Sequence, residues 1–140
     1  MAETIHVDIV SAEGEIYSGV AKMVFLPAAE GEIGVAPRHA PLLTLLKAGE
    51  VRVQPVEGPE QSFYVGGGAL EVQPTRVTVL ADTAARAHDL DEAAALAARQ
   101  RAEEALASKT DKISQAEALA ELARIAAQLK LIEKLRKIRG

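Results

Sequence analysis

The sequence contains no cysteine and no tryptophan, and its aromatic rings are limited to two phenylalanines and two tyrosines among 140 residues. The absence of cysteine excludes disulfides, thiolate catalysis and cysteine-ligated zinc, and it fits a reducing compartment. The aromatic content is too low for a base-stacking platform. No run approaches the roughly 20 apolar residues that span a bilayer, and the N-terminus lacks signal-peptide features, so we expect the protein to stay where it is made.

Proline and glycine are almost missing from the second half of the chain. All six prolines lie at or before Pro74, and Gly140 is the only glycine beyond Gly68. Turn-forming residues therefore fill one half and helix formers the other. We expect a β-domain at residues 1–84 and a helical domain at residues 88–140.

The first half has the alternating pattern of short, half-buried strands separated by frequent turns. No helical crossover intervenes, which favours an antiparallel sandwich or flattened barrel. We expect hairpin turns at residues 47–50, 57–60 and 73–75, a longer loop at 28–31, and a bulge or close backbone contact at 66–68. The predicted strands are residues 5–10, 15–17, 22–26, 32–35, 42–46, 51–56, 62–65, 70–73 and 77–80.

The second half predicts a helical hairpin. Asp89 has the character of an N-cap, and Ser114 begins a second capping pattern. The first helix would end near Ala107, with residues 108–113 as the connection. The connection contains neither glycine nor proline, so a straighter path through it is open.

The first predicted helix has little apolar surface with which to hold the second. The first is mostly alanine, so closure of the hairpin should be marginal. An opened arm would reach about 75 Å, against about 40 Å for the second helix folded back, which is a candidate switch. In the second helix, one face carries Leu122, Ile125, Leu129, Ile132 and Leu135, and the opposite one carries Lys130, Lys134 and Lys137.

The net charge of −4 is unevenly distributed along the chain. Residues 1–83 carry −6, residues 84–121 carry −3, and residues 122–140 carry +5. The basic end is either a solvated helix terminus favoured by the macrodipole or a docking surface for an acidic partner.

No chemical site emerges from the residues. His6, His39 and His88 are far apart and follow no metal-binding spacing, and no nucleophile elbow is present. We therefore expect no catalytic residues, no metal and no cofactor.

The most distinctive segment, residues 30–43, combines a strand with a loop that Pro37 and Pro41 make rigid around an exposed Arg-His pair. This segment closely resembles the epsilon subunit of bacterial F-type ATP synthase, and the resemblance covers essentially the whole chain. It extends through residues 10–13, 67–72, 79–84, 89–93 and 118–123.

The resemblance implies a flattened β-sandwich of about ten antiparallel strands followed by a two-helix hairpin. It further implies a non-catalytic subunit of the central stalk of a proton-translocating ATP synthase. Such a subunit couples rotation of gamma and the c ring to ATP synthesis, and its C-terminal helices inhibit ATP hydrolysis. The expected location is peripheral, at the cytoplasmic face of the bacterial plasma membrane.

The same resemblance implies contacts residue by residue. Glu30, Gly31 and Glu32 would face the c ring, and His39 would lie near gamma. In the extended arm, a basic face would meet an acidic segment of the alpha/beta catalytic head, with a salt-sensitive attraction. The residues expected to contact the head are Ser108, Lys130, Lys134, Arg136, Lys137 and Arg139.

One motif departs from the family's pattern. Some epsilon subunits bind ATP through a motif that Leu90 and Asp91 match here, but Ala94 occupies the arginine position. Alanine cannot replace the guanidinium contact to phosphate or ribose. We expect weak or absent nucleotide binding, with Arg101 and Arg124 as the remaining cationic candidates.

Two other classes remain as alternatives. One is a β-sandwich adaptor whose basic helical arm binds nucleic acid or another acidic partner, against which the net acidity and aromatic poverty argue. The other is a sandwich enzyme or small-molecule binder, which would need a convergent polar pocket.

Overall fold

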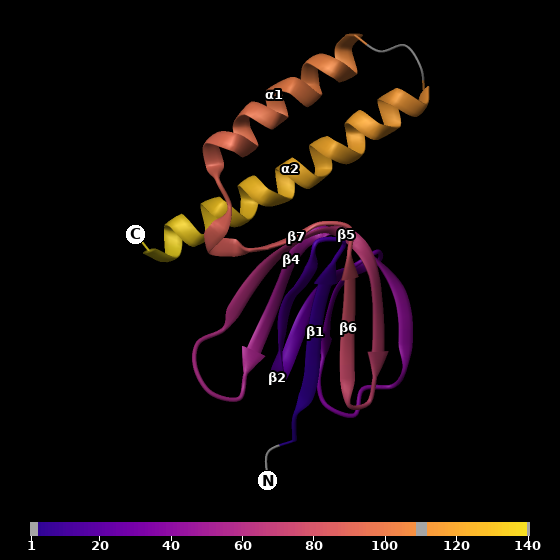
Figure 1. Ribbon diagram of the computed structural model, residues 1–140, viewed down its shortest axis with the longest axis vertical. Coiled ribbons are helices and arrows are strands. Elements are labelled where there is room, and N and C mark those ends of the chain that lie inside the picture. The colour runs from indigo at the N-terminus through magenta and orange to yellow at the C-terminus, as the bar shows by residue number, and fades with distance from the viewer. Residues whose placement is uncertain (1–2, 109–111, 140) are drawn as a thin grey trace. The chain divides into compact units, whose positions relative to one another are not determined.

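The computed structural model describes residues 3–108 and 112–139, and for residues 108, 112–114 and 139 it describes the backbone alone. Backbone contacts divide the chain between Arg86 and Ala87 into a β unit and a helical unit (Figure 1). The strands of the β unit are β1 (Ile5–Ser11), β2 (Gly14–Ala28), β3 (Gly31–Val35), β4 (Leu42–Pro55), β5 (Gln61–Gln73), β6 (Arg76–Ala81) and β7 (Ala84–Arg86).

The strands of the β unit form a sheet that closes on itself as a barrel. Its order is β1-β6-β5-β4-β2, and β1 pairs again with β2, which completes the circuit. β3 adds to β2 as an edge strand, and β7 pairs with β5. The closure places β1 beside β6 in parallel, whereas the other pairs are antiparallel as expected.

The core of the barrel follows from the alternation of apolar and polar residues along its strands. In β4, Val51 and Val53 are fully buried, while Arg52 between them faces outward. β1 repeats the pattern, because Val7 and Ile9 point inward. Successive side chains of a strand point to opposite faces, so each strand contributes one face to the core and one to the surface.

The strand count differs from the sequence-based expectation. The described residues contain seven strands, against the nine predicted from the pattern and the about ten implied by the resemblance, because several predicted strands join into long ones. Residues 47–50 were expected to turn, but they lie inside β4, where Gly49 pairs with Val65 of β5. A Cβ at Gly49 would lie 2.9 Å from Pro27 Cβ, so the glycine there accommodates a neighbouring side chain and does not make a turn.

Two other predicted turns are present, and the predicted longer loop is not. The connections predicted at 57–60 and 73–75 join β4 to β5 and β5 to β6. The predicted longer loop at 28–31 is instead a two-residue turn, since Ala28 pairs directly with Gly31.

The glycine run in β5 is architectural, as predicted. At Gly68, an added Cβ would lie 2.1 Å from the carbonyl oxygen of Leu80, and the φ of +135° also favours glycine. Here β5 changes partner from β7 to β6, and the amide of Asp82 donates to the carbonyl of Gly67 over 2.9 Å. Close backbone approach therefore requires glycine at this crossing.

The first helix begins later than predicted, and the second begins earlier. The cap of the first helix is Asp91, not Asp89, because Asp91 Oδ1 accepts from the amide of Ala94 over 3.2 Å. The second helix already begins at Lys112, so Ser114 lies within it. Of the described helices, none is long and apolar enough to cross a membrane. The elements are the 3-10 turn η1 (Ala87–Asp89), α1 (Glu92–Ser108) and α2 (Lys112–Arg139).

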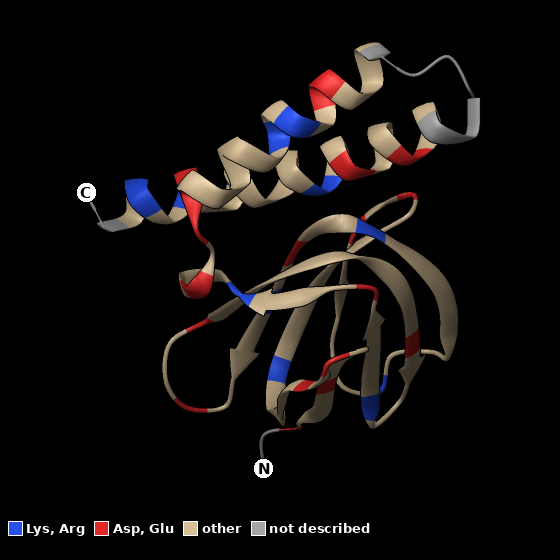
Figure 2. Cartoon of the chain, turned by 45° about the horizontal axis from the view of Figure 1, so that its top comes forward, with Lys and Arg blue, Asp and Glu red and all other residues tan. Residues whose placement is uncertain are grey.

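Small side chains form the contact between α1 and α2. Ala95 and Ala102 of α1 are buried against Ile125 of α2, with Leu122 and Leu129 partly buried beside them. Alanine offers little area to bury, so this interface contributes modestly to closure. Figure 2 shows acidic residues at the start of α1 and basic residues near the end of α2. The connection was predicted at 108–113 and to permit opening, but Ser108 ends α1 and residues 112–113 begin α2; residues 109–111 lie outside the described residues.

Candidate functional site

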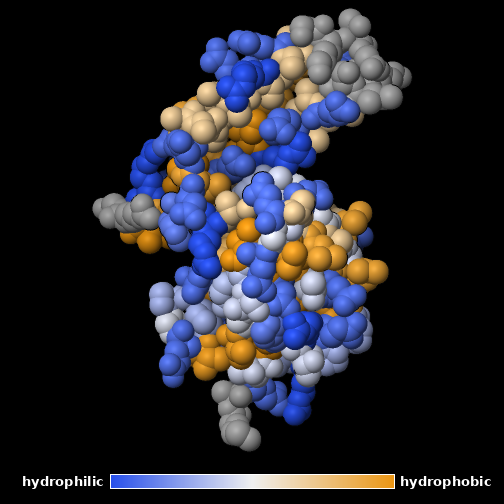
Figure 3. Space-filling model, in the orientation of Figure 1, coloured by the Kyte–Doolittle hydropathy of each residue, from blue (hydrophilic) through white to orange (hydrophobic). Residues whose placement is uncertain are grey.

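An exposed apolar row crosses the outer face of four barrel strands. Leu45 of β4 pairs with Ala69 of β5, Ala69 pairs with Leu80 of β6, and Leu80 pairs with Val10 of β1. Leu45 is 67% exposed and Leu80 is 55% exposed. Leu43, two residues along β4 on the same face, is also exposed. Figure 3 shows apolar atoms gathered on the side of the barrel that carries β6.

The apolar row differs from the scattered leucines that most surfaces carry. Its members are neighbours in register across consecutive strands, so their side chains form one continuous patch. Such patches mark interaction sites, and burial of each leucine would contribute about 1.5–3 kcal/mol. The row is therefore the strongest candidate for a docking surface on the barrel.

The turn between β2 and β3 adjoins this row. The amide of Ala29 donates to the carbonyl of Leu45 over 2.9 Å, which ties the turn to β4. Gly31 has a φ of +140°, a conformation that favours glycine. Glu30 is exposed at the turn, whereas Glu32 Oε1 lies 3.0 Å from Arg52 Nη2.

The predicted His39 site lies at the opposite end of β3, in the loop that leads to β4. Arg38 has a φ of 69°, and its amide donates to the carbonyl of Pro74 over 2.8 Å. His39 Nδ1 donates to the carbonyl of Ala40 over 2.7 Å. The residues predicted to contact the c ring and gamma thus occupy separate ends of one strand.

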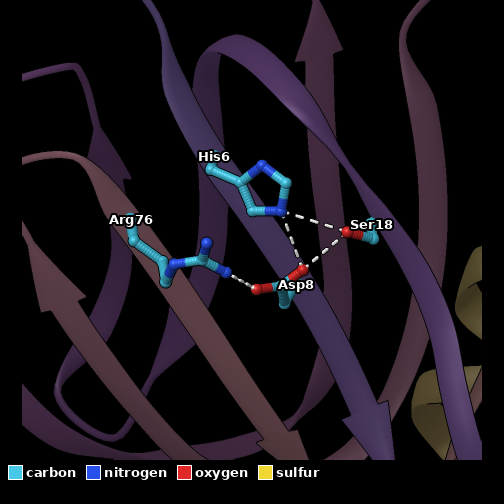
Figure 4. Close-up of polar contacts among 4 residues, drawn as sticks. All are labelled: His6, Asp8, Ser18 and Arg76. Carbon is cyan, nitrogen blue, oxygen red and sulfur yellow. Dashed lines mark hydrogen bonds and ion pairs between the residues drawn. The ribbon is translucent and has the colours of Figure 1, made fainter.

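Sequence reasoning missed a polar cluster on the outer face of β1, β2 and β6 (Figure 4). Ser18 Oγ donates to Asp8 Oδ1 over 2.7 Å, and His6 Nε2 lies 2.9 Å from the same oxygen. Arg76 forms an ion pair with the other carboxylate oxygen. The alternation of β1 places His6 and Asp8 on one face, but their partners come from strands distant in sequence.

The cluster stabilises the ionised form of Asp8. Partial burial alone would raise the pKa of Asp8. The hydrogen bonds from Ser18 and His6, with the charges of His6 and Arg76, outweigh burial and hold the pKa of Asp8 below its usual value.

The cluster contains a serine, a histidine and an aspartate, but their arrangement is not that of a catalytic triad. In a triad, the histidine uses one ring nitrogen for the serine and the other for the carboxylate. Here His6 Nε2 faces both Ser18 and Asp8. The geometry joins the strands at the seam where the barrel closes.

The basic residues of α2 are largely exposed, and several have partners within the helical unit. Arg136 pairs with Glu92 of α1, and Lys137 Nζ lies 3.5 Å from Glu133 Oε1 within α2. Lys130 and Lys134 are also exposed. The side chains of the remaining predicted head contacts, Ser108 and Arg139, lie outside the described residues.

The residues named for a weak nucleotide site are spread over the hairpin. Asp91 caps α1, and Arg101, ten residues further on, is about 15 Å away along the helix. Arg124 Nη2 pairs with Glu121 Oε2 over 2.6 Å. Leu90 borders a hollow of about 470 Å³. On the described part of the chain, Asp91, Arg101 and Arg124 do not line this hollow. Weak or absent nucleotide binding stays a prediction.

Comparison with known proteins gives two family matches that together cover nearly the whole chain. Residues 4–87 match the beta-sandwich domain of the ATP synthase Delta/Epsilon chain. Residues 88–133 match the long alpha-helix domain of the same chain.

Curated relatives and solved structures agree with these matches. The ATP synthase epsilon chain of Nitrosococcus oceani is 64% identical over 140 residues, covering all of both chains. That of Alkalilimnicola ehrlichii is 62% identical over 134 residues, 96% of each. A chain in the Euglena gracilis mitochondrial ATP synthase assembly of OSCP, F1 and c-ring has a TM-score of 0.70 at 17% identity, covering 98% of this chain and 82% of that one. A chain in the central stalk and c-ring of the Tetrahymena thermophila enzyme has a TM-score of 0.63 at 10% identity, covering 91% and 96%.

Proposed function

Because this chain belongs to the ATP synthase epsilon family, non-catalytic subunits of the central stalk of F-type ATP synthase, we propose that its barrel couples rotor and catalytic head. In this role the barrel binds gamma and the c ring, so that proton-driven rotation is transmitted to ATP synthesis. The complex would hold it at the cytoplasmic face of the bacterial plasma membrane.

The observation that carries this proposal is the exposed apolar row. A subunit that turns with a rotor needs a contact that persists through each rotation, and apolar burial supplies such a contact without depending on salt. Leu45 on β4 and Leu80 on β6 offer large apolar side chains on the two strands that flank β5. We assign this row to gamma, and the adjoining turn of Glu30, Gly31 and Glu32 to the c ring.

The solved structures of similar fold support the same assignment. The Euglena and Tetrahymena chains come from assemblies whose names include the c-ring, and the second is described as a central stalk. The presence of both chains in such assemblies supports a rotor contact for this chain. His39, at the other end of β3 from the turn, would border gamma.

The test is retention of this subunit in the assembled complex after charges are introduced into the row. The double substitution Leu45→Glu and Leu80→Glu should reduce co-purification with gamma about tenfold or more, because both carboxylates would be buried unpaired. Val56→Glu is the matched control, since Val56 is also exposed but lies in the β4–β5 connection. Full retention of the double variant would contradict the assignment.

The helical unit supports a second part of the proposal, inhibition of ATP hydrolysis. The contact between α1 and α2 depends on small side chains such as Ala95 and Ala102, so little free energy opposes its opening. An opened arm would carry the basic end of α2 toward an acidic surface of the head. Lys130, Lys134, Arg136, Lys137 and Arg139 would supply the positive charge, and Ser108 would lie along the path.

A further inference from the structure

Arg52 is held in a fixed orientation on the outer face of the barrel. It lies in β4, opposite Phe25 of β2, and its guanidinium carbon lies 4.4 Å from the centre of the Phe25 ring. Only 24% of the side chain is exposed. A guanidinium stacked on an aromatic ring is restricted in both position and plane.

The Phe25 ring fits beside β3 because the residue of β3 opposite it, Gly34, has no side chain. Gly34 pairs with Phe25, and a Cβ at Gly34 would lie 3.1 Å from Phe25 Cε1 and 2.8 Å from Met23 Cε. Gly34, Phe25 and Arg52 thus form one row across three strands. Glu32 lies two residues before Gly34, on the same face of the edge strand β3.

Each guanidinium nitrogen of Arg52 faces a different carboxylate. Nη2 lies 3.0 Å from Glu32, Nη1 lies 3.5 Å from Glu60 in the β4–β5 connection, and Nε lies 3.9 Å from Glu50 of β4. The shortest contact is the one to Glu32, whose side chain is 58% exposed. A lysine ammonium is a point charge and cannot reproduce this three-way geometry.

We propose that Arg52 is a positioning residue for the c-ring contact: it orients Glu32 and restrains the β2–β3 turn that presents Glu30 and Gly31. This inference rests on the proposed c-ring role of the turn. β3 has five residues and pairs with β2 alone; burial of Val35 holds its far end, and the Ala29–Leu45 hydrogen bond holds the backbone of the turn. The ion pair across β2 adds a side-chain attachment, from β4 to the exposed carboxylate of Glu32.

A site-specific cross-linking experiment in the assembled ATP synthase tests the proposal. The chain has no cysteine, so Ala29→Cys creates a unique attachment point in the turn for a maleimide-benzophenone reagent. The yield of the product with the c subunit reports how well the turn is held against the ring. Arg52→Gln should lower this yield about two- to fivefold, as expected for loss of an ion pair, and Arg52→Lys should restore part of it.

Two further variants separate positioning from general stability. Glu60→Gln removes another partner of Arg52 without touching Glu32, and it should leave the yield unchanged. Glu32→Gln should lower the yield as Arg52→Gln does. The variant that combines both substitutions should give a yield no lower than either single variant. Because Glu32 is itself assigned to the c ring, the role of Arg52 is judged from the double variant; if Arg52→Gln folds poorly, Arg52→Lys, which keeps the charge, takes its place in this cycle.

The outcomes distinguish the two proposals. Suppose that the Ala29→Cys chain gives a product with the c subunit. Equal yield from Arg52→Gln would then overturn the role of Arg52 alone. Additive losses in the variant that combines Arg52→Gln with Glu32→Gln would do the same. No c-subunit product from the parent would overturn the c-ring contact and, with it, the role of Arg52.

Discussion

Arg136, in the last turn of α2, forms an ion pair with Glu92, the first residue of α1. The pair joins the end of the hairpin opposite the connection between the helices. Each charge also suits the terminus on which it lies, since an acid is favoured at a helix N-terminus and a base at a C-terminus. The same guanidinium is a proposed contact to the catalytic head, so closure of the hairpin and inhibition would compete for it.

Glu92→Gln should shift the hairpin toward its open form. Both side chains are well exposed, so the pair contributes about 1 kcal/mol at most, or up to about fivefold in the ratio of the two forms. Hydrolysis by the assembled complex should fall, because Arg136 is released for the head. Electron resonance distances between labels at Ala97 and Ala126 would report the opening.

Glu133→Gln is the matched control for this prediction. It removes the same charge from a pair made within α2, where Glu133 contacts Lys137. Equal effects of the two variants would indicate a general charge effect and contradict a closing role for Glu92.

Removal of the arm should separate the two proposed roles. A chain truncated after Ala87 retains every barrel strand and the apolar row. We expect it to stay bound to gamma in the assembled complex while ATP hydrolysis rises. Hydrolysis rates measured across nucleotide conditions provide the check, and unchanged rates in all of them would remove the inhibitory role.

Asp8 should make the stability of the protein dependent on pH in the acid range. Its pKa is depressed in the folded state, so its contribution is fully present above the unfolded value of about 3.9 and is lost as pH falls through the lower folded value. Asp8→Asn should lower the free energy of unfolding by about 1–2 kcal/mol at pH 7. The difference from the parent should shrink below about pH 4.

Urea denaturation at pH 7 and at successively lower pH values would measure this difference. Asp82→Asn, which removes an exposed carboxylate elsewhere on the barrel, provides the comparison. A constant difference between Asp8→Asn and the parent across that range would show that ionisation of Asp8 is not the cause.

Gly68→Ala should destabilise the barrel by about 3 kcal/mol or more. The new Cβ would overlap the carbonyl oxygen of Leu80, and the positive φ adds strain. Gly58→Ala separates the two causes, because Gly58 also has a positive φ, +94°, but has open space around it. The control should lose only about 1 kcal/mol by thermal or urea unfolding. Similar losses for both variants would argue against the close approach.

Local patterns in the sequence predicted much of the β unit and the existence of the hairpin. Alternation at Val51, Arg52 and Val53 identified a half-buried strand, and the predicted close contact at Gly68 is present. The failures occurred where a local signal was overridden. Residues 47–50 have a turn-like composition, yet pairing with β5 continues through them, because the ladder hydrogen bonds outweigh local preference.

The proposed interaction surfaces could be predicted less well from the sequence. Leu45 and Leu80 are 35 residues apart, and only the register of β4, β5 and β6 shows that they share a face. Arg52 and Glu32 meet across an intervening strand. A residue's neighbours along the chain do not specify which partners the closed barrel will bring to it.

The sequence by itself determined that glycine and proline shape the first half and helix formers the second, and its motifs already pointed to the family. Those properties are local, since backbone freedom and side-chain periodicity act within a few residues. Tertiary structure decided which side chains form the apolar row, which carboxylates surround Arg52, and which partners stabilise the charge of Asp8. Each depends on strand order and register, which long-range pairing sets.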